Sequence, residues 1–137
     1  MSEHVDNETP EGELTLRTMA MPGDTNASGD IFGGWVLSQM DLAGGIACGE
    51  RSGGRVVTIS VDRMTFIRPV RVGDVLCVYC KLLGVGRTSM KVWIEAWARR
   101  QRVGGRVKVT EATFTFVAVD DEGRPVPVPP EQPALPD

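Results

Sequence analysis

The sequence predicts an α+β domain in which a curved antiparallel sheet of about five strands wraps one long helix. In a single stretch, about residues 31–51, apolar residues recur at the three- and four-residue spacing of an amphipathic helix. After residue 54 they recur instead at every second position, which is the period of a strand. Short glycine-rich turns divide this later part into segments. Because the helix can bury its apolar stripe only against the sheet, the two must pack together.

The first elements are a short strand, a loop and the long helix. Residues 14–21 alternate and predict the strand, whereas 22–30 are dense in turn residues and predict the loop. Asp30 stands where it could cap the helix. Several glycines lie inside this helix, and each costs about 0.5–1 kcal/mol relative to alanine. We therefore expect another backbone or a ligand to approach the helix closely. The expected apolar stripe is Phe32, Trp35, Val36, Met40, Ala43, Ile46 and Ala47.

Four strands are expected after the helix. The segments are 55–66, 74–83, 88–103 and 106–120. Hairpin turns at Gly84-Val85-Gly86 and at Gly104-Gly105 separate the last three strands. Pro69 together with Gly73 marks the bend between the first two.

The predicted domain covers residues 14–120. Residues 1–13 are polar and expected to be disordered, and 121–137 is a proline-rich tail expected to lie extended on the surface. A chain of 137 residues can bury enough surface in one core to need neither a disulfide nor a metal. No apolar run approaches the ~20 residues of a membrane span, and no signal peptide is evident. We therefore expect a cytoplasmic protein.

The charge and the cysteine content argue against a nucleic-acid-binding protein and against a zinc site. The chain has 15 basic and 18 acidic residues, hence a net charge of −3, which disfavours a nucleic-acid partner. Cys77 and Cys80 form a C-x-x-C pattern, but positions three apart on a strand face opposite ways. Only Cys48 and His4 could complete a zinc site. We therefore expect buried thiols and no metal.

Three sequence segments carry a recognisable pattern. They are MPGDTNASGDIFGGWVLSQMD, VVTISVDRMTFIRPVRVGD and VGRTS. Together they strongly resemble the YciA-type acyl-CoA thioesterases of the hotdog-fold superfamily. The resemblance runs from about 14 to 120 and is interrupted only around 99–107, where lengths vary. It implies a hotdog fold, an acyl-CoA substrate and hydrolysis without any cofactor beyond that substrate.

Asp41 and Asn26 are the polar candidates for catalysis. Asp41 lies inside the helix, where aspartate is a poor helix former and is expensive to bury without a partner. On spacing alone, Asp41 could equally be an ordinary aspartate that faces solvent. The resemblance implies that Asp41 is the catalytic carboxylate, acting as general base or as nucleophile. Asn26 suits a turn by itself, and the resemblance implies that it orients water or the substrate carbonyl.

Gly33 and Gly34 stand in the first helical turn. Backbone N–H groups there lack partners within the helix and lie at its positive end. A glycine allows a thioester carbonyl to come close, so one of these amides would form the oxyanion hole. Close packing of the helix against a strand explains glycine equally well, and both explanations can hold.

The other candidates would bind CoA. Arg87, Thr88 and Ser89 follow a glycine-rich turn and could form a small anion site. The resemblance implies that this site holds the CoA phosphates or the pantetheine arm. Arg68 is a second phosphate candidate. Thr58 either lines the site from the facing subunit or belongs to a solvated polar face.

Two other functions occur on hotdog domains, dehydration and non-catalytic acyl-CoA binding. Hotdog dehydratases typically use a histidine, and the sequence contains only His4, in the expected tail. A non-catalytic acyl-CoA-binding regulator is the remaining alternative, although the sequence has no basic recognition helix for DNA.

The resemblance also implies an oligomer, with a dimer as the minimum. Two sheets would join edge to edge, with two sites at the junction, and this would cover an open sheet edge. Trp93 and Trp97 alternate with apolar residues that suit the helix side, so they are expected on the outer face of the sheet. We expect them to join dimers into a trimer of dimers. The alternative is that residues 125–136 cover them within one subunit.

Overall fold

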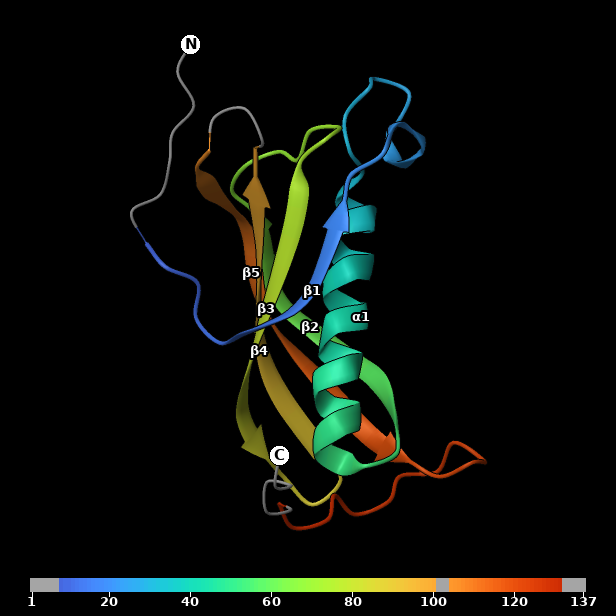
Figure 1. Cartoon of the computed structure of the whole chain (residues 1–137). Coiled ribbons are helices and arrows are strands. Elements are labelled where there is room, and N and C mark those ends of the chain that lie inside the picture. Colours follow the sequence, from blue (N-terminus) through green and yellow to red (C-terminus); the bar gives the residue numbers. More distant parts are fainter. Residues whose placement is uncertain (1–7, 101–103, 132–137) are drawn as a thin grey trace, which may run out of the picture.

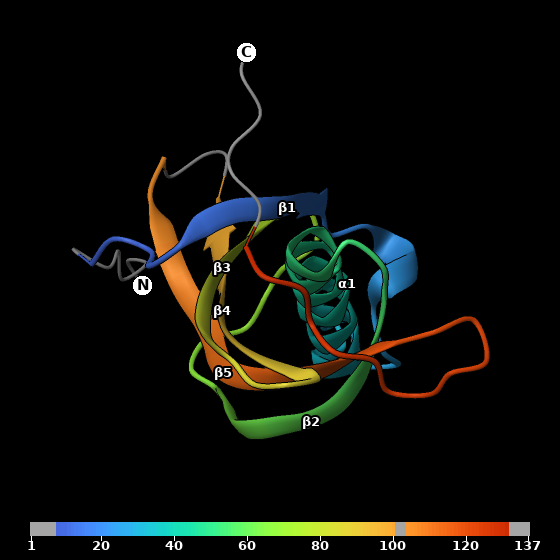
Figure 2. The same cartoon turned by 90° about the horizontal axis from the view of Figure 1, so that it is seen from below.

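A computed structural model describes residues 8–100 and 104–131. One helix lies along the concave side of one antiparallel sheet, as Figures 1 and 2 show. The strand order is β1-β3-β4-β5-β2, so β1 and β2 form the two edges. The predicted fold class is confirmed. In chain order the elements are β1 (Glu13–Met19), the short 3₁₀ helix η1 (Pro22–Asp24), α1 (Gly33–Ser52), β2 (Arg55–Phe66), β3 (Val75–Val85), β4 (Ser89–Arg99) and β5 (Arg106–Val119).

The core lies between α1 and the sheet, and small residues on the helix make close packing possible. A Cβ atom added at Gly44 would lie 2.7 Å from the ring of Phe116 and 2.8 Å from Ile94. Side chains cannot approach so closely, so this glycine is needed for packing against β4 and β5. The helix-facing residues of β4 are all fully buried: Met90, Val92, Ile94, Ala96 and Ala98.

The start of α1 differs from the expected one. Phe32 occupies the N-cap position, and no side chain of the described residues caps the helix there. Asp30 instead donates its backbone N–H to Asn26 Oδ1 and is held in the preceding turn. The helix ends as glycine permits, with Gly53 in the left-handed conformation at φ 75°.

The expected strand boundaries also shift. β3 continues through Gly84 and Val85, two residues of the expected turn. A bulge between Leu82 and Gly84 shifts the register, and pairing with β4 resumes after it. β4 ends at Arg99, short of the expected 103, and residues 101–103 lie outside the described part. Within the described ranges, no helix is both long and apolar enough to span a membrane.

The outer face of β4, turned away from α1, carries a buried carboxylate. Glu95 is 2% exposed and accepts hydrogen bonds from the indole N–H groups of Trp93 (2.7 Å) and Trp97 (2.9 Å). Both tryptophans therefore lie on the expected face. Trp97 is nevertheless 0% exposed within the subunit, so its ring is not available on the surface for the expected contact between dimers. Arg106 and Lys108 lie over its ring, each 5.7 Å from the centroid.

The chain that reaches this carboxylate comes from the N-terminal side. The backbone N–H of Glu11 donates to Glu95 Oε1 over 3.3 Å. Figure 2 shows this segment on the side of the sheet opposite α1. Within the expected N-terminal tail of residues 1–13, Glu13 already belongs to β1, and Glu11 bonds to the buried carboxylate. Residues 1–7 lie outside the described part.

The proline-rich tail runs elsewhere. Val126 donates its N–H to the carbonyl of Ala118, and Val128 donates to that of Arg87. Both valines pack against the helix-side core. As far as it is described, the tail crosses the end of α1 and does not cover the tryptophans (Figure 2). Residues 132–136 lie outside the described part, so for them that alternative stays a prediction.

We expect Glu95→Ala to lower the free energy of unfolding by about 3 kcal/mol, because removal of one partner leaves the other groups of a buried pair uncompensated. Lys108 Nζ lies 3.9 Å from Glu95 Oε2; the Glu95 side chain is buried, and that of Lys108 is 13% exposed. Urea unfolding would measure this change. Glu13→Ala, at an exposed carboxylate, is the control and should change stability by less than about 0.5 kcal/mol. A similar small loss in both variants would contradict the role given to Glu95.

Candidate active site

Asp41 is paired with a hydroxyl of its own chain. It lies in the middle of α1, half-buried, and its Oδ1 accepts a hydrogen bond of 2.5 Å from Thr58 Oγ1. Thr58 belongs to β2, against which α1 packs. The structure thus brings Thr58 to Asp41 within one subunit, which the sequence analysis did not foresee. A carboxylate held by one hydroxyl and still open to solvent can take up a proton from water.

The N-terminus of α1 provides free amides. Trp35 and Val36 donate their N–H groups to the carbonyl of Phe32. For Gly33 and Gly34, no acceptor exists among the described residues. A Cβ atom at Gly33 would lie 3.2 Å from the ring of Phe66, whereas one at Gly34 would meet nothing within 4 Å. Gly33 is therefore closely packed against Phe66, whereas Gly34 leaves open space beside two unpaired donors.

An apolar cleft of about 420 Å³ opens beside these amides. It lies between the start of α1 and the segment that follows β2. Arg68 is the charged residue of the wall, and one of its guanidinium nitrogens donates to the carbonyl of Lys108 over 3.0 Å. The apolar walls were not predicted from the sequence, although the run Phe66-Ile67 beside Arg68 was a usable signal. The lining residues are Ile31, Gly33, Val36, Phe66, Ile67, Arg68, Pro69, Val70 and Val109.

Asp41 does not line this cleft. It follows Gly33 by eight positions on a continuous helix, which at 1.5 Å per residue separates the two by about 12 Å along the axis. The N–H groups of the first turn also point away from the helix body. One subunit therefore does not bring the expected carboxylate and the expected oxyanion amides to one carbonyl group.

Asn26 organises its own loop. Its Oδ1 accepts from the backbone N–H groups of Ser28 (2.9 Å) and Asp30 (3.1 Å). Its backbone N–H donates to the carbonyl of Asp30. This is the turn geometry that asparagine favours. No hydrogen bond joins Asn26 to Asp41 among the described residues, so a catalytic role for Asn26 stays a prediction.

Arg87, Thr88 and Ser89 lie at the β3–β4 hairpin. Gly86 donates its N–H to the carbonyl of Ser89, and Thr88 accepts from Ala118 through its carbonyl. The Arg87 side chain is exposed.

The two arginine candidates lie at opposite ends of the sheet. The hairpin carrying Arg87 follows the last residue of β3, whereas the segment carrying Arg68 precedes its first. The 11 residues of β3 span roughly 35 Å. One subunit alone cannot bring both arginines to the same phosphates.

The cysteines have the orientation expected of a strand. Cys80 lies in the helix-side core with Cys48, while Cys77 is buried on the other face, paired with Trp97. Burial, with the Cys80 thiol nearby, raises the pKa of Cys48 to about 12. Burial also raises the pKa of Cys80. Among the described residues, no group of three or more histidine, cysteine or acidic side chains is placed to hold a metal ion.

The pKa of Cys48 predicts a loss of stability in alkali. In the folded state this thiol keeps its proton between its ordinary pKa of 9.0 and about 12, whereas in the unfolded state it loses that proton. The unfolded state then binds fewer protons, so the free energy of unfolding falls as pH rises through this window. Urea unfolding from pH 8 to 11 should show a shallower decline for Cys48→Ala than for the unchanged protein. Parallel declines would show that Cys48 does not contribute.

Similarity to known proteins shows the family of this chain. Residues 28–105 match the family model described as the thioesterase superfamily. Acyl-CoA thioester hydrolase YciA of Salmonella typhimurium is 55% identical over 124 residues, covering 88% of this chain and 93% of the relative. The chain belongs to the thioesterase superfamily. Its relatives at this level of identity are named as acyl-CoA thioester hydrolases.

Solved structures of this superfamily agree in fold. The hexameric thioesterase y2039 from Yersinia pestis superposes with a TM-score of 0.84 at 55% identity, covering 88% of this chain and 98% of the other. HI0827, described as a hexameric broad specificity acyl-coenzyme A thioesterase, superposes with a TM-score of 0.87 at 50% identity, covering 92% of this chain and 88% of the other. The hotdog fold is thereby established for this chain, since Cj0915 of Campylobacter jejuni, at 47% identity, is described by that fold name.

Proposed function

We propose that this chain hydrolyses acyl-CoA thioesters to a free carboxylic acid and CoA. The observation that carries the proposal is a half-buried, solvent-accessible carboxylate, Asp41, held by Thr58 on a thioesterase fold. As general base, Asp41 takes a proton from water while the water oxygen attacks the thioester carbonyl. The tetrahedral oxyanion accepts a hydrogen bond from the N–H of Gly33 or Gly34. The C–S bond then breaks, and the CoA sulfur leaves with the proton returned by Asp41. Direct attack by the carboxylate is the alternative role.

The separation of these groups supports a site shared between two subunits. Asp41 stands about 12 Å from its own helix N-terminus, so another helix N-terminus must supply the oxyanion donor. β2 is an edge strand, and pairing of two β2 edges in antiparallel fashion would turn the two helices in opposite directions. Asp41 of one subunit would then face the helix N-terminus and apolar cleft of the other.

Exposed apolar residues support the same pairing. They lie on β2 and on α1. Ile59 in β2 is 59% exposed and Leu42 in α1 is 57% exposed. Exposed apolar side chains on and beside an open edge strand are typical of an interface, because such an edge can pair with a second chain. The set comprises Leu42, Ile46, Val57, Ile59 and Val61.

We further propose that the dimers assemble into a homohexamer arranged as a trimer of dimers. The hexameric state named for the relatives HI0827 and y2039 supports this. Trp93, which remains partly exposed on the outer face, is the tryptophan available for contact between dimers.

The activity is tested directly by release of the CoA thiol. A panel of acyl-CoA esters from short to long chain, followed with a colorimetric thiol reagent, should show turnover on at least one ester. Binding of acyl-CoA without thiol release from any member would instead identify a non-catalytic regulator.

Arg87 and Arg68 are proposed to hold CoA phosphates from the two subunits that form each site. Contacts to phosphate exist in the ground state and the transition state alike, so Arg87→Ala should raise KM with little change in kcat. A charge-assisted contact of about 1.5–3 kcal/mol predicts a rise of roughly 10- to 100-fold. Steady-state kinetics with one acyl-CoA measures this. Arg55→Ala, on an arginine held by carbonyls at the end of β5, is the control. An unchanged KM would remove Arg87 from the site.

A further inference from the structure

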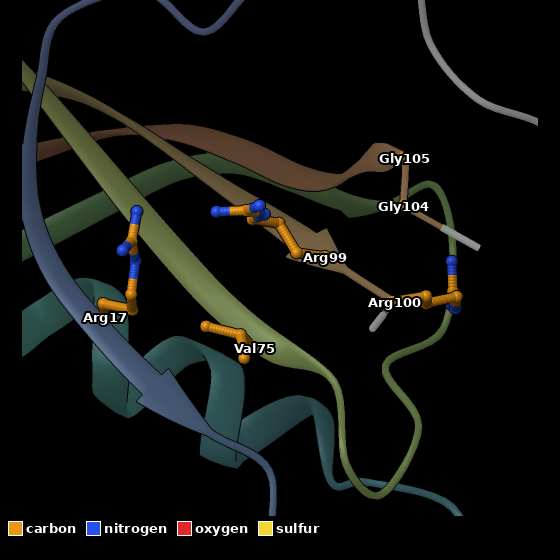
Figure 3. Close-up of a pocket in the computed structure, with 6 residues that line it drawn as sticks. All are labelled: Arg17, Val75, Arg99, Arg100, Gly104 and Gly105. Atoms are coloured by element: carbon orange, nitrogen blue, oxygen red, sulfur yellow. The ribbon is translucent and has the colours of Figure 1, made fainter. Parts of the chain in front are cut away.

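A second cavity lies on the face of the sheet opposite α1. It has a volume of about 240 Å³ and is lined by residues from three neighbouring strands and the chain after β4. In Figure 3 the side chains of Arg17 on β1 and Arg99 on β4 extend into the space on either side of Val75. The remaining lining residues are Arg100, Gly104 and Gly105.

Strand register places this cavity away from the proposed active site. Arg99 pairs with Val75 and follows Ala98, whose side chain is in the helix-side core. Arg17 pairs with Cys77, which lies outside that core. Both arginines therefore project from the outer face, with the sheet between them and α1.

The arginines of this cavity differ in their partners. Arg100 turns toward the segment after β2, where it donates to the carbonyl of Pro69 and lies 3.5 Å from Asp74 (Figure 3). Among the residues that the structure describes, neither Arg17 nor Arg99 has a carboxylate within ion-pair distance. Two like charges at one cavity repel each other, so a negatively charged occupant would be stabilised there.

Further positive charge stands beside the pair. Arg106 of β5 is the cross-strand neighbour of Arg99 and holds its guanidinium over the ring of Trp97. This concentration of cations occurs in a chain whose net charge is −3, so it is a local feature and not a consequence of composition.

We propose that Arg17 and Arg99 form an anion site that binds a phosphate group, separate from the proposed active site. Guanidinium groups match phosphate oxygens with two parallel hydrogen bonds, which favours phosphate over a halide. A volume of 240 Å³ equals roughly eight water molecules of liquid, enough for a phosphate or diphosphate with some hydration. The site takes free phosphate or the phosphate-rich end of a nucleotide such as that of CoA, and it does not depend on the proposed thioesterase activity.

Titration calorimetry on the full chain tests this proposal, with inorganic phosphate, ADP and CoA as separate probes. The double variant Arg17→Gln/Arg99→Gln should lose about tenfold or more in affinity for at least one probe, since it removes both charge-assisted contacts to the phosphate. Lys91→Gln is the matched control, because Lys91 is exposed on the same face of β4 but does not line the cavity. Its affinities should not change.

The three probes and the other arginines separate the possible sources of binding. Equal affinity for phosphate and ADP assigns the site to free phosphate, whereas tighter ADP and CoA assigns it to the nucleotide end. Arg68→Gln/Arg87→Gln should weaken CoA binding at the proposed active site but retain the binding of inorganic phosphate at this one. The proposal is overturned if phosphate binding is lost in that variant and kept in Arg17→Gln/Arg99→Gln. It is also overturned if light scattering shows the Arg17→Gln/Arg99→Gln protein dissociating while its phosphate affinity is unchanged, since the arginines would then join copies of the chain.

Discussion

Asp41→Ala and Asp41→Asn are expected to reduce turnover of acyl-CoA by about 10²–10⁴-fold, the usual loss when a general base is removed. Asp41→Asn is the sharper variant, because its amide oxygen can still accept the hydrogen bond from Thr58 while it can no longer take a proton. The fold should survive, since the side chain is only half-buried and bonds to one hydroxyl. Thiol release at saturating substrate measures the effect, with circular dichroism to confirm folding.

Asp62→Asn provides the control for this loss. Asp62 is an exposed carboxylate on β2, the strand that carries Thr58, and its removal should leave turnover within about twofold of normal. A folded Asp41→Asn protein with near-normal turnover on its best substrate would disprove the proposed mechanism.

The second large effect concerns the sharing of each site between subunits. Gly34→Val should be nearly inactive, because its side chain would fill the open space beside the free amides, where an added Cβ meets no other group within 4 Å. Mixing it with the inactive Asp41→Ala protein should restore activity. A mixed dimer with shared sites carries both changes in one site and neither in the other. Random pairing of equal amounts should then regenerate about a quarter of the normal sites.

Sites built within one subunit give the opposite result. Every site of a mixed dimer would then carry one damaging change, and activity would stay near zero after mixing. Denaturation and joint refolding of the two variants ensures that subunits exchange, and refolding each alone is the control. Gly34→Ala should retain more activity than Gly34→Val, because a smaller side chain fills less of the space.

The fold could be predicted because its determinants are local. The period of the apolar residues changes after the turn that ends at Gly54, and this alone distinguishes the helix from the strands that follow. The glycine-rich helix also indicated close packing, and Gly44 shows the reason, because a Cβ atom added there would lie under 3 Å from Phe116 and Ile94. Boundaries were less predictable, since a bulge at Gly84 lets β3 continue through an expected turn.

The outer face could not be predicted in the same way. Alternation correctly placed Trp93 and Trp97 opposite the helix, but it carries no information on what else packs there. Trp97 is buried because Arg106 and Lys108, which belong to the neighbouring strand β5, lie over its ring.

By itself the sequence determined the order of the elements, the packing of one helix against one sheet and the residue types available for chemistry. Tertiary structure alone decided which of those residues meet. Asp41 and Thr58 are 17 positions apart and bond across the helix–sheet contact, whereas Asp41 and Gly33 share a helix and remain about 12 Å apart. Periodicity specifies the face on which a side chain lies, but the partners on that face come from chain segments whose approach is set only by folding and by association of subunits.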